Sequence, residues 1–130
     1  MIDIAAPNKL WISLTNKCNL RCLHCLPDSH TSMVNELSKE EILGLIENAK
    51  ELGVRRIAFT GGEPTLHPDL LDFVAAASGD QRRVYVESNG AKLSVDRLSA
   101  LQASGLNILN LSLDGGSPES NDSFRGAKGL

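Results

Sequence analysis

Three closely spaced cysteines are the residues of this chain best suited to chemistry. Cys18, Cys22 and Cys25 follow a short apolar run and are the only cysteines in the sequence. Thiolates are soft ligands that select iron–sulfur clusters, zinc or copper. An odd number of cysteines in a compact loop favours metal binding over disulfides. Because a cubane cluster normally takes four thiolates, three would leave one iron open for a further ligand.

Two other interpretations of the cysteine loop stay open on residue types alone. A structural zinc site could combine the three thiolates with His24 or His30. Zinc motifs usually take ligand pairs from two separate places, however, and this chain has no second cysteine pair. Three unligated cysteines in a core are the weaker alternative, because a polar loop is hard to bury.

Short apolar runs and helical patterns alternate along the chain and must position this loop. Four runs rich in β-branched or aromatic residues predict strands at 10–14, 57–59, 84–86 and 108–113. Capping residues and apolar spacing predict three helices, from Ser38 to Gly53, from Pro68 to Gly79 and from Ser94 to Gly105. In the first helix, Ile42, Leu45, Ile46 and Ala49 form the expected apolar stripe.

The alternation predicts an α/β fold with a parallel sheet and right-handed crossovers. We expect loop structure from 117 to 130, with a helical turn after Pro118. Ligand chemistry in parallel α/β folds collects at the carboxyl ends of the strands. The segments that follow the four strands are Thr15 to Asn35, Gly61 to Pro64, Ser88 to Gly90 and Asp114 to Gly116. The unusual residues of the sequence fall in or beside these segments, which predicts one shared site.

Composition narrows the class of protein. Hydrophobic residues make up 42 % of the 130 residues and the formal net charge is -3, which indicates one globular domain over 1–130. Scattered charges and an aromatic content of 4 % argue against a nucleic-acid partner. No apolar run approaches the roughly 18 residues of a membrane helix. The start has no signal-peptide pattern, so we expect a cytoplasmic protein without a membrane partner.

Several motifs in order resemble those of the radical S-adenosylmethionine (SAM) superfamily. Cys18-x3-Cys22-x2-Cys25 resembles the family's cluster signature, and Thr60-Gly61-Gly62-Glu63-Pro64 resembles its Gly-Gly-Glu motif. The segments 87–90 and 111–115, with 121–126 after them, resemble later motifs of one branch. That branch contains molybdenum-cofactor and haem-pathway enzymes, sulfatase maturases and peptide-modifying enzymes. The resemblance covers nearly the whole chain.

The resemblance implies a role for each matching residue. Cys18, Cys22 and Cys25 would ligate a [4Fe–4S] cluster. The implied SAM contacts are His24, Gly61, Gly62, Glu63, Ser88, Asn89, Ser112 and Arg125. Of these, His24 would lie against the adenine, the glycines would admit the methionine moiety, and the Glu63 carboxylate would accept a hydrogen bond from the SAM ammonium. Ser112 and Arg125 would reach the ribose or carboxylate. The alternative for these residues is that they bind no ligand. In that case the segments 61–62, 89–90 and 114–115 are simple turns and Arg125 is a solvated loop residue.

The implied activity is that of a radical SAM enzyme. It would cleave SAM reductively to a 5′-deoxyadenosyl radical, which abstracts hydrogen during cofactor biosynthesis or peptide and protein modification. A flavodoxin-like or ferredoxin-like reductant protein is the implied electron donor. The alternative function is a non-catalytic metal- or cluster-binding interaction module, or an inactive fragment of such an enzyme.

The family's partial (β/α) barrel has six strands, whereas this sequence predicts about four strands and three helices. The chain therefore resembles the N-terminal part of a radical SAM core domain. The fourth strand would be an apolar sheet edge that invites pairing. A fragment of a longer enzyme, a homodimer or partner subunit that completes the barrel, and a degraded relative remain open.

Overall fold

The computed structural model describes residues 7–25, 29 and 35–129. Strands and helices alternate through most of this part of the chain. In order, the elements are β1 (Lys9–Ser13), α1 (Lys39–Glu51), β2 (Arg56–Thr60), the 3-10 turn η1 (Pro64–Leu66), α2 (Leu70–Ala77), β3 (Arg83–Ser88), α3 (Val95–Ala103), β4 (Ile108–Leu111) and α4 (Pro118–Arg125). The predicted α/β class and the four predicted strands are confirmed.

The four strands form one parallel sheet in the order β1-β2-β3-β4. Strand order and chain order are therefore the same, and α1, α2 and α3 each connect neighbouring strands. Trp11, Ala58, Tyr85 and Ile108 lie side by side across the sheet in consecutive pairs. Because side chains alternate between the two faces of a strand, this register fixes which residues share a face.

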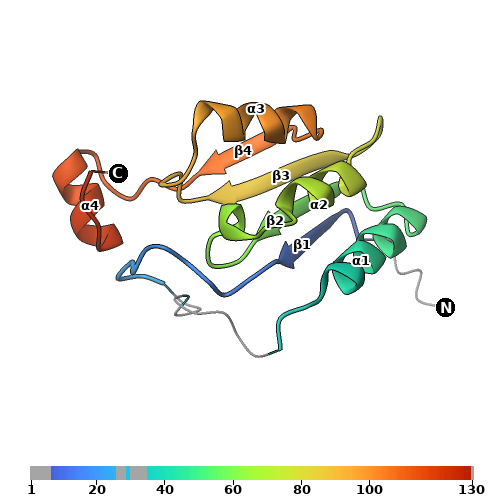
Figure 1. Ribbon diagram of the computed structural model, residues 1–130, viewed down its shortest axis with the longest axis horizontal. Helices are drawn as coiled ribbons and strands as arrows, with labels where there is room; N and C mark the ends of the chain where they lie inside the picture. The colour runs from blue at the N-terminus through green and yellow to red at the C-terminus, as the bar shows by residue number, and fades with distance from the viewer. Residues whose placement is uncertain (1–6, 26–28, 30–34, 130) are drawn as a thin grey trace.

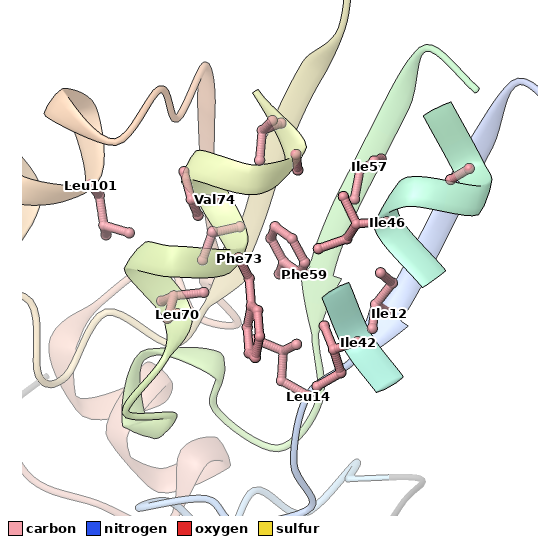
Figure 2. Packing of buried hydrophobic residues seen from close by; sticks show 14 of the residues in the cluster. Ile12, Leu14, Ile42, Ile46, Ile57, Phe59, Leu70, Phe73, Val74 and Leu101 are labelled. Atoms are coloured by element: carbon pink, nitrogen blue, oxygen red, sulfur yellow. The ribbon is translucent and has the colours of Figure 1, made fainter. Parts of the chain in front are cut away.

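One face of the sheet carries the hydrophobic core. Its larger members come from β1 and the residue after it, from β2 and from the three helices that cover the sheet. Figure 2 shows how they pack: Ile12, Leu14, Ile42, Ile46, Ile57, Phe59, Leu70, Phe73, Val74 and Leu101. The rings of Phe59 and Phe73 lie 6.3 Å apart, centroid to centroid. Full burial of such a side chain contributes roughly 1.5–3 kcal/mol, so this face anchors the fold. α1, α2 and α3 pack on the side of the sheet that carries this core (Figure 1).

Capping residues set the ends of α1, and one cluster of charged side chains joins α1 to α2. Ser38 and Glu41 form the predicted capping box at the start of α1, and Gly53 follows its end with a φ of 76°. Lys39 donates to Asp69 Oδ1 at 2.8 Å and also to the Asp72 carboxylate. Those hydrogen bonds raise the pKa of Lys39 above its usual value. This ammonium ties the start of α1 to the start of α2.

The structure corrects several details of the sequence prediction. The segment after Ser117, expected to be a loop with one helical turn, contains the two-turn helix α4, so the described residues form four α-helices where three were predicted. The predicted stripe on α1 includes Leu45, yet this side chain is exposed because only Ile42, Ile46 and Ala49 face the sheet. Pro68 precedes α2 and is not in its first turn.

The carboxyl ends of the strands point toward the same edge of the molecule. The cysteine loop and α4 both lie beyond that edge, although about 90 residues separate them in sequence (Figure 1). In the described part of the chain, no helix is long and apolar enough to cross a membrane.

Candidate functional site

A pocket of about 340 Å³ opens where the strand ends meet the cysteine loop. Its lining comes from five separate segments of sequence: Cys18, Leu20, Cys22, His24, Cys25, Ser29, Thr60, Gly61, Gly62, Glu87, Ser88, Asn89, Ser112 and Arg125. All of the site residues predicted from the sequence belong to this set, with the exception of Glu63. The fold therefore brings the cysteines and nearly all predicted cofactor contacts to one place.

The three cysteines are free thiols, each half-buried at the pocket. The Leu20 amide N–H points to Cys18 Sγ at 3.4 Å, and the Ser29 N–H points to Cys25 Sγ at 3.4 Å. N–H groups directed at sulfur stabilise a thiolate and raise the potential of a cluster bound to it. The loop thus supplies thiols together with N–H donors that suit their charged form.

Cys22 lies in a mixed electrostatic environment. Burial raises the pKa of its thiol, the Arg125 cation opposes that rise, and the neighbouring thiols Cys18 and Cys25 add to it. A buried thiol that must lose its proton needs a compensating positive charge nearby. Arg125 is the cation that supplies this charge.

The two glycines after β2 are required by the cysteine loop itself. A Cβ built on Gly61, whose φ is 135°, would lie 2.4 Å from the Thr15 carbonyl oxygen, and one on Gly62 would lie 2.5 Å from the Lys17 carbonyl oxygen. The Gly62 and Glu63 amides donate to these same carbonyls at 2.7 and 2.9 Å. The absence of side chains therefore allows two backbones to meet, and this contact holds the cysteine loop against the sheet.

Glu63, which the sequence resemblance implies as the acceptor for the SAM ammonium, lies outside the pocket lining. Its side chain is 0 % exposed. One carboxylate oxygen accepts from the Thr65 amide at 3.1 Å, from the Thr65 hydroxyl at 2.5 Å and from the Ser88 hydroxyl at 2.8 Å, and the other accepts from the Asn89 amide at 2.8 Å. Glu63 therefore positions the loops after β2 and β3, and it is not part of the pocket lining.

Ser88 and Asn89, which donate to the Glu63 carboxylate, also line the pocket. Asn89 Nδ2 lies 3.8 Å from Cys18 Sγ and 2.9 Å from Asn19 Oδ1, so it spans the gap to the cysteine loop. Ser112 lines the pocket from the segment after β4, where its amide donates to the Ser88 carbonyl at 3.0 Å. The ends of β3 and β4 are thus joined at the pocket wall.

Arg125 is almost completely buried, with 3 % of its surface exposed. Its Nη2 lies 2.5 Å from Asp114 Oδ2. Among the described residues, its Nε is a buried nitrogen without a hydrogen-bond partner. An unsatisfied buried donor is unfavourable, so this Nε–H still lacks the hydrogen bond that a buried polar group normally makes.

The last turn of α4 is docked on the cysteine loop. His24 stacks on Phe124 with ring centroids 4.8 Å apart, and its Nε2 lies 3.7 Å from Asp114 Oδ2. The Leu23 amide donates to the Phe124 carbonyl at 2.9 Å. These contacts between Phe124 and the cysteine loop place Arg125, the next residue of α4, at the pocket.

Sequence reasoning did not single out six contributors to this site: Leu20, Ser29, Thr60, Glu87, Asp114 and Phe124. Asp114 was interpreted as a turn residue within a strand-end segment, and the others only as parts of a loop or motif. The position of Asp114, directly after the fourth apolar run, is the signal that could have identified it, because carboxyl ends of parallel strands share an edge. His30, the other histidine of the zinc alternative, lies outside the described residues.

The donor set fits a four-iron cluster. Among the described residues, no three His, Cys, Asp or Glu side chains converge closely enough to hold a single metal ion. A cubane binds each thiolate at a different iron and needs no such convergence. Three thiolates with N–H donors, beside a guanidinium with a free donor, also suit a cluster whose fourth iron takes an anionic external ligand.

Comparison with known proteins gives a family match over most of the chain. Residues 12–129 match the model of the Radical SAM superfamily. The chain is 47 % identical over 110 residues to the GTP 3′,8-cyclase of Synechococcus elongatus, which covers 81 % of this chain and 33 % of that enzyme. It is 38 % identical over 124 residues to the Fe-coproporphyrin III synthase of Methanosarcina barkeri, which covers 95 % of this chain and 31 % of that enzyme.

Solved structures share the fold. Streptococcus suis SuiB bound to S-adenosylmethionine superposes with a TM-score of 0.81 at 22 % identity, over 95 % of this chain and 29 % of that one. BtrN in complex with AdoMet and 2-DOIA superposes with a TM-score of 0.72, over 85 % and 47 % of the two chains. The chain spans about a third of the length of the curated relatives it matches.

Proposed function

The chain belongs to the radical SAM superfamily, whose members are enzymes that use a [4Fe–4S] cluster and SAM, and we propose that this chain binds both. The observation that carries the proposal is the convergence of three thiolates and the orphaned Arg125 Nε on one pocket. When bound, the cluster and SAM supply reductive cleavage of SAM to a 5′-deoxyadenosyl radical for hydrogen abstraction. This region is then the N-terminal part, 1–130, of a radical SAM core domain.

We expect different residues of this chain to bind the cluster and SAM. Cys18, Cys22 and Cys25 would hold the cluster, and the pocket beside them would admit SAM. The Arg125 Nε–H would donate to an anionic group of SAM, with the guanidinium oriented by Asp114. A charge-assisted hydrogen bond in a buried position is stronger than a neutral one.

The remaining lining residues would surround SAM and exclude water. Gly61 and Gly62 offer backbone close to the cluster, Ser112 offers a hydroxyl, and the ring of His24 provides a flat surface at the pocket mouth. Ser88 and Asn89 would contribute from the end of β3, in positions that Glu63 fixes. Exclusion of water strengthens the electrostatic interactions inside a reactive site.

Cofactor biosynthesis is the reaction context we propose, since the curated relatives include the GTP cyclase and the synthase named above. Peptide or protein modification is the second context, because one SuiB structure is bound to its precursor peptide SuiA. A flavodoxin-like or ferredoxin-like protein would deliver the electron. We place this activity in the cytoplasm, where thiols are kept reduced.

A further chain or segment would complete the barrel at β4. Leu111 and Leu113, at the end of this edge strand, are 59 % and 76 % exposed. Such an edge is a template for pairing. A homodimer, a partner subunit or further sequence of the same protein would each cover it. Light scattering after size exclusion separates a dimer from a monomer.

The decisive experiment is anaerobic reconstitution with iron and sulfide, followed by SAM and dithionite, with detection of 5′-deoxyadenosine by mass spectrometry. We expect product from the native chain and none from Cys22→Ala. The matched control is Ser104→Ala, a substitution at the far end of α3.

The outcome separates the two candidate functions. A reconstituted cluster with SAM binding and product supports the radical enzyme. A cluster that forms without any SAM binding supports the interaction module. If Cys22→Ala reconstitutes the same electronic spectrum as the native chain, the ligand assignment is wrong.

A further inference from the structure

The side chain of Asn89 reaches from the loop after β3 to the sulfur of Cys18. Its Nδ2 lies 3.8 Å from Cys18 Sγ, a length that the larger radius of sulfur allows for a hydrogen bond, and 2.9 Å from Asn19 Oδ1. The side chain is half-buried at the pocket. Because an amide NH2 group has two hydrogens, these two acceptors use both of them.

The orientation of this amide is set at its other end. Asn89 Oδ1 accepts from the Ala91 amide at 2.9 Å, and the backbone N–H of Asn89 donates to the Glu63 carboxylate at 2.8 Å. A flipped side chain would bring its NH2 group against the Ala91 N–H, and its oxygen against Cys18 Sγ and Asn19 Oδ1. The hydrogen-bond network therefore assigns the NH2 group to the side that faces Cys18.

The cysteine sulfurs differ in the donors that face them. In the described part of the chain, Cys18 Sγ accepts from the Leu20 amide at 3.4 Å and from Asn89, whereas Cys25 Sγ accepts from the Ser29 amide alone. Of these three donors, Asn89 is the one that a side chain provides. Any residue at positions 20 and 29 except proline would keep the backbone donors, so position 89 is where the sequence can adjust this contact.

A donor aimed at a cluster-bound sulfur favours the reduced cluster. Reduction adds one negative charge, which the sulfurs share, and an N–H group stabilises the more negative state more strongly. Partial burial strengthens this interaction, because it lowers the local dielectric. The Asn89 amide has no hydrogen left for SAM, so its donors serve the thiolate and its neighbour in the loop.

We propose that Asn89 raises the reduction potential of the cluster by donating to the Cys18 thiolate. It is a positioning residue that acts through a cluster ligand, and its amide does not donate to SAM. Glu63 supports it by holding its backbone. This inference rests on the proposed function, since it concerns the cluster that the three thiolates would hold.

The variant Asn89→Asp tests the assignment with little change of shape. Aspartate keeps the acceptor for Ala91 and the backbone donor to Glu63, but its carboxylate has no hydrogen for Cys18. The chain is reconstituted with iron and sulfide, without SAM, and a redox titration followed by electron paramagnetic resonance gives the midpoint potential. We expect reduction to become at least tenfold less favourable, a fall of about 59 mV for a one-electron couple.

The matched control is Asn19→Asp. It adds the same charge within hydrogen-bond distance of Asn89 and leaves the donor to Cys18 in place. Position 19 is exposed, so solvent and salt screen the added charge. We expect the reduction equilibrium to change by less than threefold. Equal falls in the two variants overturn the proposal, because charge alone then explains them.

Spectroscopy on the native chain checks the contact without a substitution. With ¹⁵N in the asparagine side chains, electron spin echo modulation of the reduced cluster is expected to show a coupled amide nitrogen. Absence of that coupling overturns the proposal, and so does a native potential in Asn89→Asp, while in both cases the proposed cluster binding stands. Failure of the native chain to form a cluster overturns the proposed function and this inference together, so the two failures are distinguishable.

Discussion

Asp114 Oδ2 holds Nη2 of Arg125 at 2.5 Å, and Nε of the same guanidinium is left without a protein partner in the described part of the chain. The loop into α4 thus supplies the carboxylate, and the end of α4 supplies the cation. A planar guanidinium fixed at one nitrogen has the direction of its other donors fixed too. The pair therefore prepares a directed donor before any ligand arrives.

Replacing Arg125 should affect SAM more than the fold. A hydrogen bond to a charged group contributes about 1.5–3 kcal/mol, so we expect Arg125→Gln to weaken SAM binding to the reconstituted chain by about 10- to 100-fold. Anaerobic equilibrium dialysis measures this. Arg125→Lys keeps the charge without the planar fork, so its SAM affinity should lie between those of the native chain and Arg125→Gln. Native affinity in Arg125→Gln would contradict the assigned contact.

Gly62→Ala should detach the cysteine loop from the sheet. The added Cβ meets the Lys17 and Asn16 carbonyl oxygens at 2.5 and 2.6 Å, and backbone cannot yield as a side chain can. We expect cluster content, measured as iron and sulfide per chain, to fall well below half. Gly44→Ala is the matched control, since its Cβ meets nothing within 4 Å in α1. That control should stabilise the fold by about 0.5–1 kcal/mol.

Glu63→Gln should lower the stability of the fold even without a cofactor. The carboxylate accepts four hydrogen bonds, and an amide presents an NH2 group to at least one of those donors. We expect a loss of about 2–4 kcal/mol in the free energy of unfolding by urea, because buried donors lose their partner. Glu51→Gln at the exposed end of α1 is the control and should change it by less than about 0.5 kcal/mol. A loss confined to SAM affinity, with native stability, would instead support a direct ammonium contact.

The Lys39 cluster predicts a dependence of stability on alkaline pH. Hydrogen bonds from the Lys39 ammonium to the Asp69 and Asp72 carboxylates raise the pKa of Lys39 in the folded state. A raised folded-state pKa stabilises the fold below the unfolded value of about 10.4, and the contribution is lost as pH rises through the folded pKa. The difference in unfolding free energy between the native chain and Lys39→Met should therefore be constant from pH 7 to 9 and shrink above about pH 10.4. A difference that grows with pH would refute the assignment.

The sequence predicted the scaffold well because its signals are local. The Ser38–Glu41 capping box and Gly53 mark the limits of α1 within a few residues, and the apolar runs mark the strands. The cysteine spacing also located the loop that forms the pocket. By contrast, α4 was expected only as a single helical turn, because its residues are polar and its last turn packs on the distant cysteine loop.

Side-chain direction at the site could not be predicted from the sequence. The burial of Glu63 depends on donors contributed by Thr65, Ser88 and Asn89, of which the last two are 25 and 26 residues away. The role of Asp114 depends in the same way on Arg125 and His24. Such contacts follow from the folded arrangement, whereas sequence spacing reports only which residues can share a strand end.

The identity of strand order and chain order has a consequence for how this site is assembled during synthesis. Domains generally fold from the N-terminus as the ribosome releases them. Each new strand here can add to an edge that already exists, so the thiols emerge first, the Gly61–Glu63 segment then secures their loop, and Arg125 arrives last. The three thiols are thus in place before the cation that completes the pocket.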